Sequence, residues 1–133
     1  MNPHSFHELL RELMQEKFPK IAVRTPVRTG ELSTPYLILT CTGEALLVPG
    51  NNTWECSLAV ELHTNAYDNP GADSRDIFSR ICSAVADKST KKSLNERASD
   101  FYVYSLAQRS LDEPSTEDND FIQRANYRLV IQY

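Results

Sequence analysis

The amino-acid sequence predicts an α+β fold in which two helices pack on a mainly antiparallel sheet, in the element order α-β-β-β-α-β-β. Two segments carry apolar residues at the spacing of an amphipathic helix, and one long segment alternates apolar and polar residues as a half-buried strand does. The segments do not alternate as β-α-β units, which disfavours a parallel sheet. The 133 residues suffice for one small domain, which we expect to span residues 1–133.

The first helix is predicted over residues 5–18. Ser5 and Glu8 stand three residues apart, which is the spacing of a capping box at a helix start. Pro19 is expected to end the helix because proline disfavours the helical conformation of the residue before it. The apolar stripe that should pack on the sheet consists of Phe6, Leu9, Leu10, Leu13, Met14 and Phe18.

Strands dominate the next part of the chain. Prolines at positions 19, 26 and 35 limit residues 21–23 to a short edge strand. Residues 36–41 are apolar on both faces, and residues 42–44 are expected to turn the chain into a second short run, 45–48. The clearest strand is 54–63, whose predicted core face consists of Trp54, Cys56, Leu58, Val60 and Leu62.

The second half of the chain is predicted to hold a helix and then a hairpin. Asp73 or Ser74 is expected to cap a helix over residues 74–86. The polar residues 87–97 are expected to fray or to form a short extra turn. Two β-rich runs, 101–106 and 122–133, should form the hairpin, joined by a loop over 107–121.

That loop is strongly acidic. It holds five carboxylates and no basic residue between positions 111 and 120: Asp112, Glu113, Glu117, Asp118 and Asp120. The chain has a net charge of -4, so removing these five charges leaves the remainder at +1. Repulsion among the acids argues against a packed element, and we therefore expect the segment to be mobile.

No enzymatic or metal chemistry is predicted. The four glycines are isolated, so no phosphate-binding loop is expected. His4 and His7 lack a third ligand fixed by the sequence and are interpreted as solvated. Glu55 and Glu61 share a strand face but lie roughly 20 Å apart, which is too far for an acid–base pair. The three cysteines lie in apolar patterns and are expected to be buried, unreactive thiols: Cys41, Cys56 and Cys82.

Membrane insertion and nucleic acid recognition are also disfavoured. No apolar run approaches the length that spans a bilayer. The negative net charge opposes general binding to phosphates. Aromatic residues occur at 101–104, but no basic residue lies among them. We therefore expect neither a membrane segment nor specific nucleic acid binding, and no cofactor.

The element order and the character of the strands resemble the tail terminator, or tail completion, proteins of tailed bacteriophages. The strand PYLILT, the long alternating strand WECSLAVELHTNA and the terminal run RLVIQY carry this resemblance over most of the chain. It implies a non-enzymatic protein that forms a hexameric ring on the tail tube in the virion, assembled in the cytoplasm of the bacterial host. The implied partners are other copies of the chain, the tail-tube protein and the head–tail connector protein.

Two other classes remain open. One is a different phage subunit, such as a tail-tube or head–tail joining protein. The other is a bacterial dimeric α+β module that binds a ligand, or a small enzyme. The number of subunits in the assembly separates these classes, because a closed ring, an open-ended tube and a dimer have different symmetries.

The acidic loop is the candidate interface. One interpretation is a solvated hairpin tip that contributes to solubility. The other is a contact with a basic surface on the next subunit or on a tail or connector partner. The candidate basic residues on this chain are Arg24, Arg28, Lys88, Lys91 and Lys92.

Overall fold

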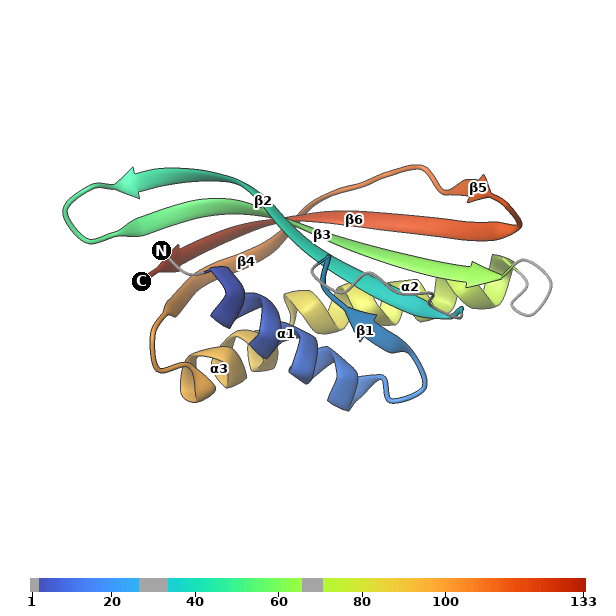
Figure 1. Ribbon diagram of the computed structural model, residues 1–133, viewed down its shortest axis with the longest axis horizontal. Coiled ribbons are helices and arrows are strands. Elements are labelled where there is room, and N and C mark those ends of the chain that lie inside the picture. Colours follow the sequence, from blue (N-terminus) through green and yellow to red (C-terminus); the bar gives the residue numbers. More distant parts are fainter. Residues whose placement is uncertain (1–2, 27–33, 66–70) are drawn as a thin grey trace.

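The computed structural model describes residues 3–26, 34–65 and 71–133 (Figure 1). In these ranges it contains three helices and six strands, so the predicted α+β class is confirmed. The elements are α1 Pro3–Lys17, β1 Ala22–Arg24, β2 Tyr36–Val48, β3 Thr53–Asn65, α2 Gly71–Ala86, α3 Lys88–Arg97, β4 Tyr102–Leu111, β5 Ser115–Glu117 and β6 Asp120–Gln132.

The strands form one sheet in the order β1-β2-β3-β6-β4, and β5 pairs with β6. The β1–β2 pair is parallel and every other pair is antiparallel, which confirms the mainly antiparallel prediction. All three helices lie on one side of the sheet (Figure 1). The sheet therefore has one covered face and one face that carries no helix among the described residues.

The hydrophobic core lies between the helices and the covered face. The side chains of Leu58, Val60 and Leu62 on β3 are fully buried, as the alternation predicts. The neighbouring strand β6 alternates in the same way and buries Tyr127, Leu129 and Ile131. Apolar side chains at every second position of two paired strands thus form a continuous surface on which the helices pack.

Helix α1 packs its predicted apolar stripe on the sheet but starts two residues earlier than expected. Pro3 occupies the first position, which suits proline because it lacks an N–H that would need a partner. Ser5 therefore lies within the helix, and the predicted capping box is wrong. The Ser5 hydroxyl donates to Asp100 at 2.6 Å, and Glu8 accepts from Arg11. The prediction of a solvated His7 is also wrong, since its Nε2 accepts from the Cys41 N–H at 2.8 Å.

Strand β2 is one continuous strand, so the turn predicted at 42–44 is wrong. Gly43 has a φ of 66°, a conformation that glycine adopts without strain, and the register of the β2–β3 ladder shifts between Thr42 and Ala45. The irregularity is a β-bulge, which bends a strand without ending it. The predicted runs 36–41 and 45–48 are therefore two parts of the same strand.

The end of the β2–β3 hairpin, residues 42–53, forms an arm that extends beyond the helices (Figure 1). Every β2 residue in it is exposed. The turn of the arm is held by the end of the chain, because the Tyr133 N–H donates to the Asn52 carbonyl at 3.2 Å. Beside the turn, the half-buried Trp54 donates its indole N–H to the Asn52 side chain at 2.7 Å. These bonds fix the position of an otherwise exposed hairpin.

Two helices differ from the sequence prediction. Helix α2 begins at Gly71, so Asp73 and Ser74 lie within it and do not precede it. Residues 88–97, predicted to fray, form the complete helix α3. The Asp87 side chain caps α3 by accepting from the Ser89 N–H at 2.8 Å. Burial of Leu94 then anchors this polar helix to the core, giving three helices in place of the predicted two.

Strands β4 and β6 form the predicted C-terminal hairpin, with longer bounds than expected. The acidic segment between them is partly ordered, which differs from the loop that its composition predicts. Residues 115–117 form β5, and a tight turn follows in which Asp118 and Asn119 have positive φ values. All three β5 residues are exposed, so backbone pairing with β6 orders this segment without burying its charges.

We predict that Leu58→Ala lowers the free energy of unfolding by about 2–5 kcal/mol, because it leaves a cavity at a fully buried position. Urea unfolding measures this change. The matched control is Ser57→Ala on the opposite face of the same strand, which should change stability by less than about 0.5 kcal/mol. Equal effects of the two substitutions would contradict the assigned strand facing.

Candidate assembly interface

Among the described residues, no group of three or more histidine, cysteine or acidic side chains is placed to hold a metal ion. The side chain of His4 lies outside the described residues, so the His4–His7 pair is not defined. The Cys56 side chain points toward the helices. His63 lies an odd number of residues further along β3, so its side chain points to the opposite face of the sheet. Cys56 and His63 therefore do not form a nucleophile–base pair.

The three cysteines are free thiols in apolar surroundings. Burial raises the pKa of Cys41 to about 12, and the same cause raises the pKa of Cys56 to about 11. The pKa of Cys82 is raised as well, again chiefly by burial. A thiol must lose its proton to act as a nucleophile, so all three are chemically quiet at neutral pH.

The face of the sheet without a helix carries a network of ion pairs. Glu55 accepts from Arg128 at 2.7 Å and from Arg109 at 2.9 Å, which joins β3, β6 and β4. The hydrogen bond from Arg128 is the main cause that holds the pKa of Glu55 below its usual value. A second group lies further along the face, where Arg124 is 3.9 Å from Glu61 and 3.7 Å from Asp112.

His63 closes this network at the β2 side of the face. Its Nε2 pairs with the Glu61 carboxylate, and its ring stacks on Tyr36 with centroids 4.5 Å apart. The hydrogen bond with His63 is the main cause that lowers the pKa of Glu61. Glu55 and Glu61 thus share the exposed face, as predicted, and each pairs with arginine. Such ion pairs between neighbouring strands are typical of charged side chains that stabilise the surface of a sheet.

The structure places the predicted acidic and basic residues far apart. The β5 turn lies at one end of the long axis, whereas α3 lies beneath the other half of the sheet (Figure 1). Asp112 already pairs with Arg124 and accepts from Asn126 at 3.1 Å. The four other predicted acids, Glu113, Glu117, Asp118 and Asp120, form no ion pair with a described residue.

The basic candidates also differ in their surroundings. Lys88, Lys91 and Lys92 lie on α3, where Lys92 is 4.0 Å from Glu96 and Lys91 donates to the Tyr104 carbonyl. Arg24 lies at the end of β1 and donates to the Val23 carbonyl. Arg28 lies outside the described residues. No chain can therefore bring its own acidic turn to its own α3 lysines, and a contact between them requires two molecules.

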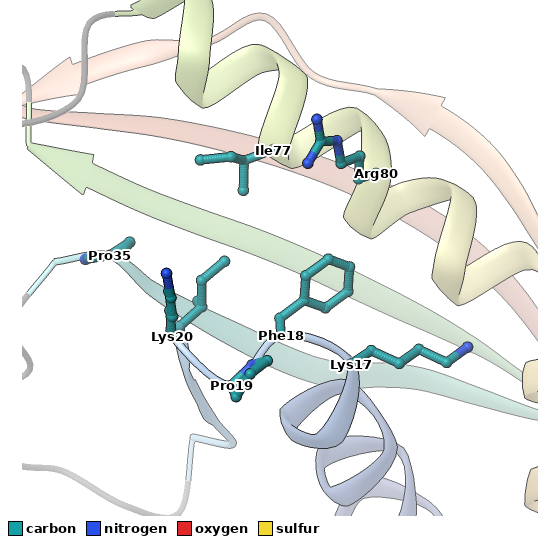
Figure 2. A pocket seen from close by; sticks show the side chains of 8 residues that line it. Lys17, Phe18, Pro19, Lys20, Pro35, Ile77 and Arg80 are labelled. Carbon is teal, nitrogen blue, oxygen red and sulfur yellow. The ribbon is translucent and has the colours of Figure 1, made fainter.

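A cavity of about 430 Å³ lies between the end of α1, the start of β2 and the middle of α2 (Figure 2). Its apolar lining is Phe18, Pro19, Ile21, Pro35 and Ile77, and its charged lining is Lys17, Lys20 and Arg80. The charged side chains that line it, among the described residues, are all basic. Sequence reasoning missed this cavity because its lining residues come from separate elements.

The most informative surface is the pair of sheet edges. Residues 39–48 of β2 and the whole of β4 each pair with a strand on one side only, within the described residues. Among the described residues, six large hydrophobic side chains are exposed and all lie on these two strands, from 41% exposed for Leu47 to 60% for Leu111. They are Leu46, Leu47 and Val48 on β2, and Tyr102, Tyr104 and Leu111 on β4. Apolar side chains on unpaired edges are typical of surfaces that become covered.

No protein-family model and no curated protein matches this sequence. Two solved structures share its fold. A chain from a structure described as the virion of a native gene transfer agent particle aligns with a TM-score of 0.63 and 13% identity, covering 93% of this chain and 84% of that one. A second chain, which carries no functional description, aligns with a TM-score of 0.65 and 13% identity, covering 97% and 92%. The chain thus shares its fold, over nearly its whole length, with these two chains.

We predict that the thiols react slowly with a thiol reagent in the native protein at neutral pH, because burial keeps them protonated. Mass spectrometry should find the cysteines almost unlabelled until denaturant is added, and then all three labelled. Rapid labelling of Cys41 or Cys56 in the native protein would revive a catalytic role for that residue.

Proposed function

We propose that the protein is a non-enzymatic structural protein of a phage or phage-like particle, and that it closes the tail tube as a ring. In this role it ends polymerisation of the tube and offers a surface to the head–tail connector. Its partners are further copies of the chain, the tail-tube protein and the connector protein, and it resides in the tail of the virion.

The observation that carries the proposal is the fold shared with a chain of the gene transfer agent virion. That likeness covers most of both chains, so it involves the complete arrangement of sheet and helices rather than one motif. Resemblance to the tail terminators points to the same kind of particle and adds the specific position at the end of the tube.

The surface chemistry supports an assembly role. The titratable groups of the open sheet face are engaged in ion pairs, and the thiols are held protonated by burial. In contrast, two sheet edges and one acidic turn lack partners among the described residues. Groups without a partner in one molecule are the groups that a neighbouring molecule can satisfy.

A mass measurement on the purified protein tests the ring. We expect a closed assembly whose mass is six times the 15.1 kDa of the chain, observed by native mass spectrometry and seen as rings by electron microscopy. Added to purified tail tubes, gold-labelled protein should bind at one end of each tube. Open-ended tubes would instead indicate a tube protein, and a stable dimer would indicate a ligand-binding module.

The acidic turn is expected to contribute to these contacts in a salt-dependent way. We predict that the variant Glu113→Gln, Glu117→Gln and Asp118→Asn weakens assembly at low ionic strength and has little effect at high ionic strength, because exposed pairs are screened by salt. Light scattering across a salt series measures the difference. Asp112 stays unchanged because it pairs with Arg124 in its own chain.

The matched control removes the same number of exposed acids from the helices: Glu12→Gln, Asp76→Asn and Glu96→Gln. It should assemble as the wild-type protein does at every salt concentration. Equal behaviour of the two variants would leave the acidic turn as a solvated hairpin tip.

A further inference from the structure

We propose that neighbouring copies of this chain join edge to edge, with β4 of one copy beside residues 39–48 of β2 in the next. This inference rests on the proposed ring, and it identifies the surface by which the ring closes. The first observation is that the exposed large hydrophobic side chains of the described residues lie on these two edges, three on each. The second is that β4 and positions 39–48 of β2 each pair with a strand on one side only, although side chains of α3 already satisfy the β4 backbone at 103–104.

The direction of the strands allows this pairing. β2, β3, β6 and β4 are each antiparallel to the next, so β2 and β4 run in opposite directions at the two ends of the path. When copies are related by rotation about an axis along the strands, β4 of one copy meets β2 of the next as an antiparallel neighbour. The sheet then continues across the boundary with the same pairing that it uses inside the chain.

The side chains match at one end of the pairing. Tyr102 lies at the start of β4, and antiparallel alignment places it opposite Val48 of the neighbour, with Leu111 opposite Leu39. The two tyrosines of β4, Tyr102 and Tyr104, pack edge to face at 4.9 Å and form an apolar platform on the surface. The exposed apolar end of the arm, residues 46–48, comes to lie along this platform. Burial of both surfaces removes apolar area from water.

Charge matches at the other end. β1 pairs with the start of β2 and ends at Arg24, which lies opposite Ile38, next to the free edge. Glu113 follows Leu111 by two residues, so the alignment brings it to Arg24 of the neighbour. Neither residue has an ion pair with a described residue of its own chain. If two copies instead paired β2 with β2 about a two-fold axis, Arg24 of each copy would lie against the apolar arm of the other. Neither the charge of Arg24 nor the apolar side chains of the arm would then have a suitable partner.

Two side chains of α3 set the limits of the backbone pairing. The Asn95 side chain accepts from the Val103 N–H at 2.7 Å and donates to the Val103 carbonyl at 2.9 Å. Lys91 donates to the Tyr104 carbonyl. The edge of β4 is therefore already satisfied at 103–104, and backbone pairing with a neighbour begins at residue 105. The contact at 102–104 is made by side chains.

Two edge variants and their mixture test the inference. The arm variant is Leu46→Glu with Leu47→Glu, and the β4 variant is Tyr102→Glu with Tyr104→Glu. Each variant has one blocked and one intact edge, so each should remain monomeric. A mixture in equal amounts should form a dimer of twice 15.1 kDa, because the intact β4 edge of one variant meets the intact β2 edge of the other. Native mass spectrometry distinguishes these species.

The control variant is Arg80→Glu on the α1 side of α2, which changes the charge by the same two units away from β4 and from residues 39–48 of β2. It should form the same ring as the wild-type protein. Recovery of the dimer in the mixture also shows that both edge variants are folded. Dimerisation of either edge variant by itself would overturn the head-to-tail arrangement.

The remaining outcomes separate the two proposals. If an edge variant still forms the ring, the edge pairing is wrong while the proposed function stands. If the wild-type protein stays monomeric up to millimolar concentration and does not bind tail tubes, the proposed function fails, and the edge pairing fails with it. A wild-type tube, with both edge variants monomeric, would retain the edge pairing and replace the closed ring by an open polymer.

Discussion

The antiparallel pairing of β3 with β6 is the interaction on which the other elements depend. Both strands have thirteen residues and they pair along their length, from Thr53 opposite Gln132 to Asn65 opposite Asp120. Because side chains alternate between faces, this one register sets which residues of both strands meet the helices. A shift of β6 by one residue would turn Tyr127 toward the open face and bring Arg128 toward the core.

The helices cover only one face of the sheet, so the other face and the two sheet edges must be stabilised or protected in other ways. The open face is stabilised by pairs between strands, such as Glu55 with Arg128, rather than by burial. The sheet also ends in two edges, and natural proteins usually protect such edges with charged side chains, prolines or a covering element. Here α3 protects β4 at 103–104 only, whereas the arm projects three apolar residues into solvent. These few exposed apolar residues thus lower the solubility of the separate chain, and the proposed edge pairing would cover them.

Sequence reasoning succeeds where one periodicity dominates. The alternation from Trp54 to Leu62 and the stripe from Phe6 to Phe18 predict most of the core, because each pattern is local and strong, although Trp54 and Phe18 at the ends of these patterns are only partly buried. It fails at Gly43, since a lone glycine is compatible with a turn or a bulge, and pairing with β3 decides between them. It fails at α3 because that helix has few apolar residues, and its anchor, Leu94, becomes apparent only against the sheet.

The candidate interface was predictable only in part. The acids of residues 112–120 are evident from composition, but the pairing of Asp112 with Arg124 depends on a strand register that composition does not encode. The edge residues were not foreseen, because Leu46 and Tyr104 are ordinary strand residues by sequence. Their position at unpaired edges follows from the sheet order, which leaves residues 39–48 of β2 and the whole of β4 at the two sides of the sheet.

The bond from Trp54 to Asn52 gives the arm a spectroscopic property of its own. Trp54 is the single tryptophan of the chain, and it lies half-buried beside the turn of the arm, opposite Leu46, with its indole N–H held by the Asn52 side chain. Indole fluorescence depends on the polarity around the ring, so the emission of the whole protein reports on this one position. Solvent exclusion at the arm is therefore visible in the unlabelled molecule, without a dye that would itself alter the apolar surface.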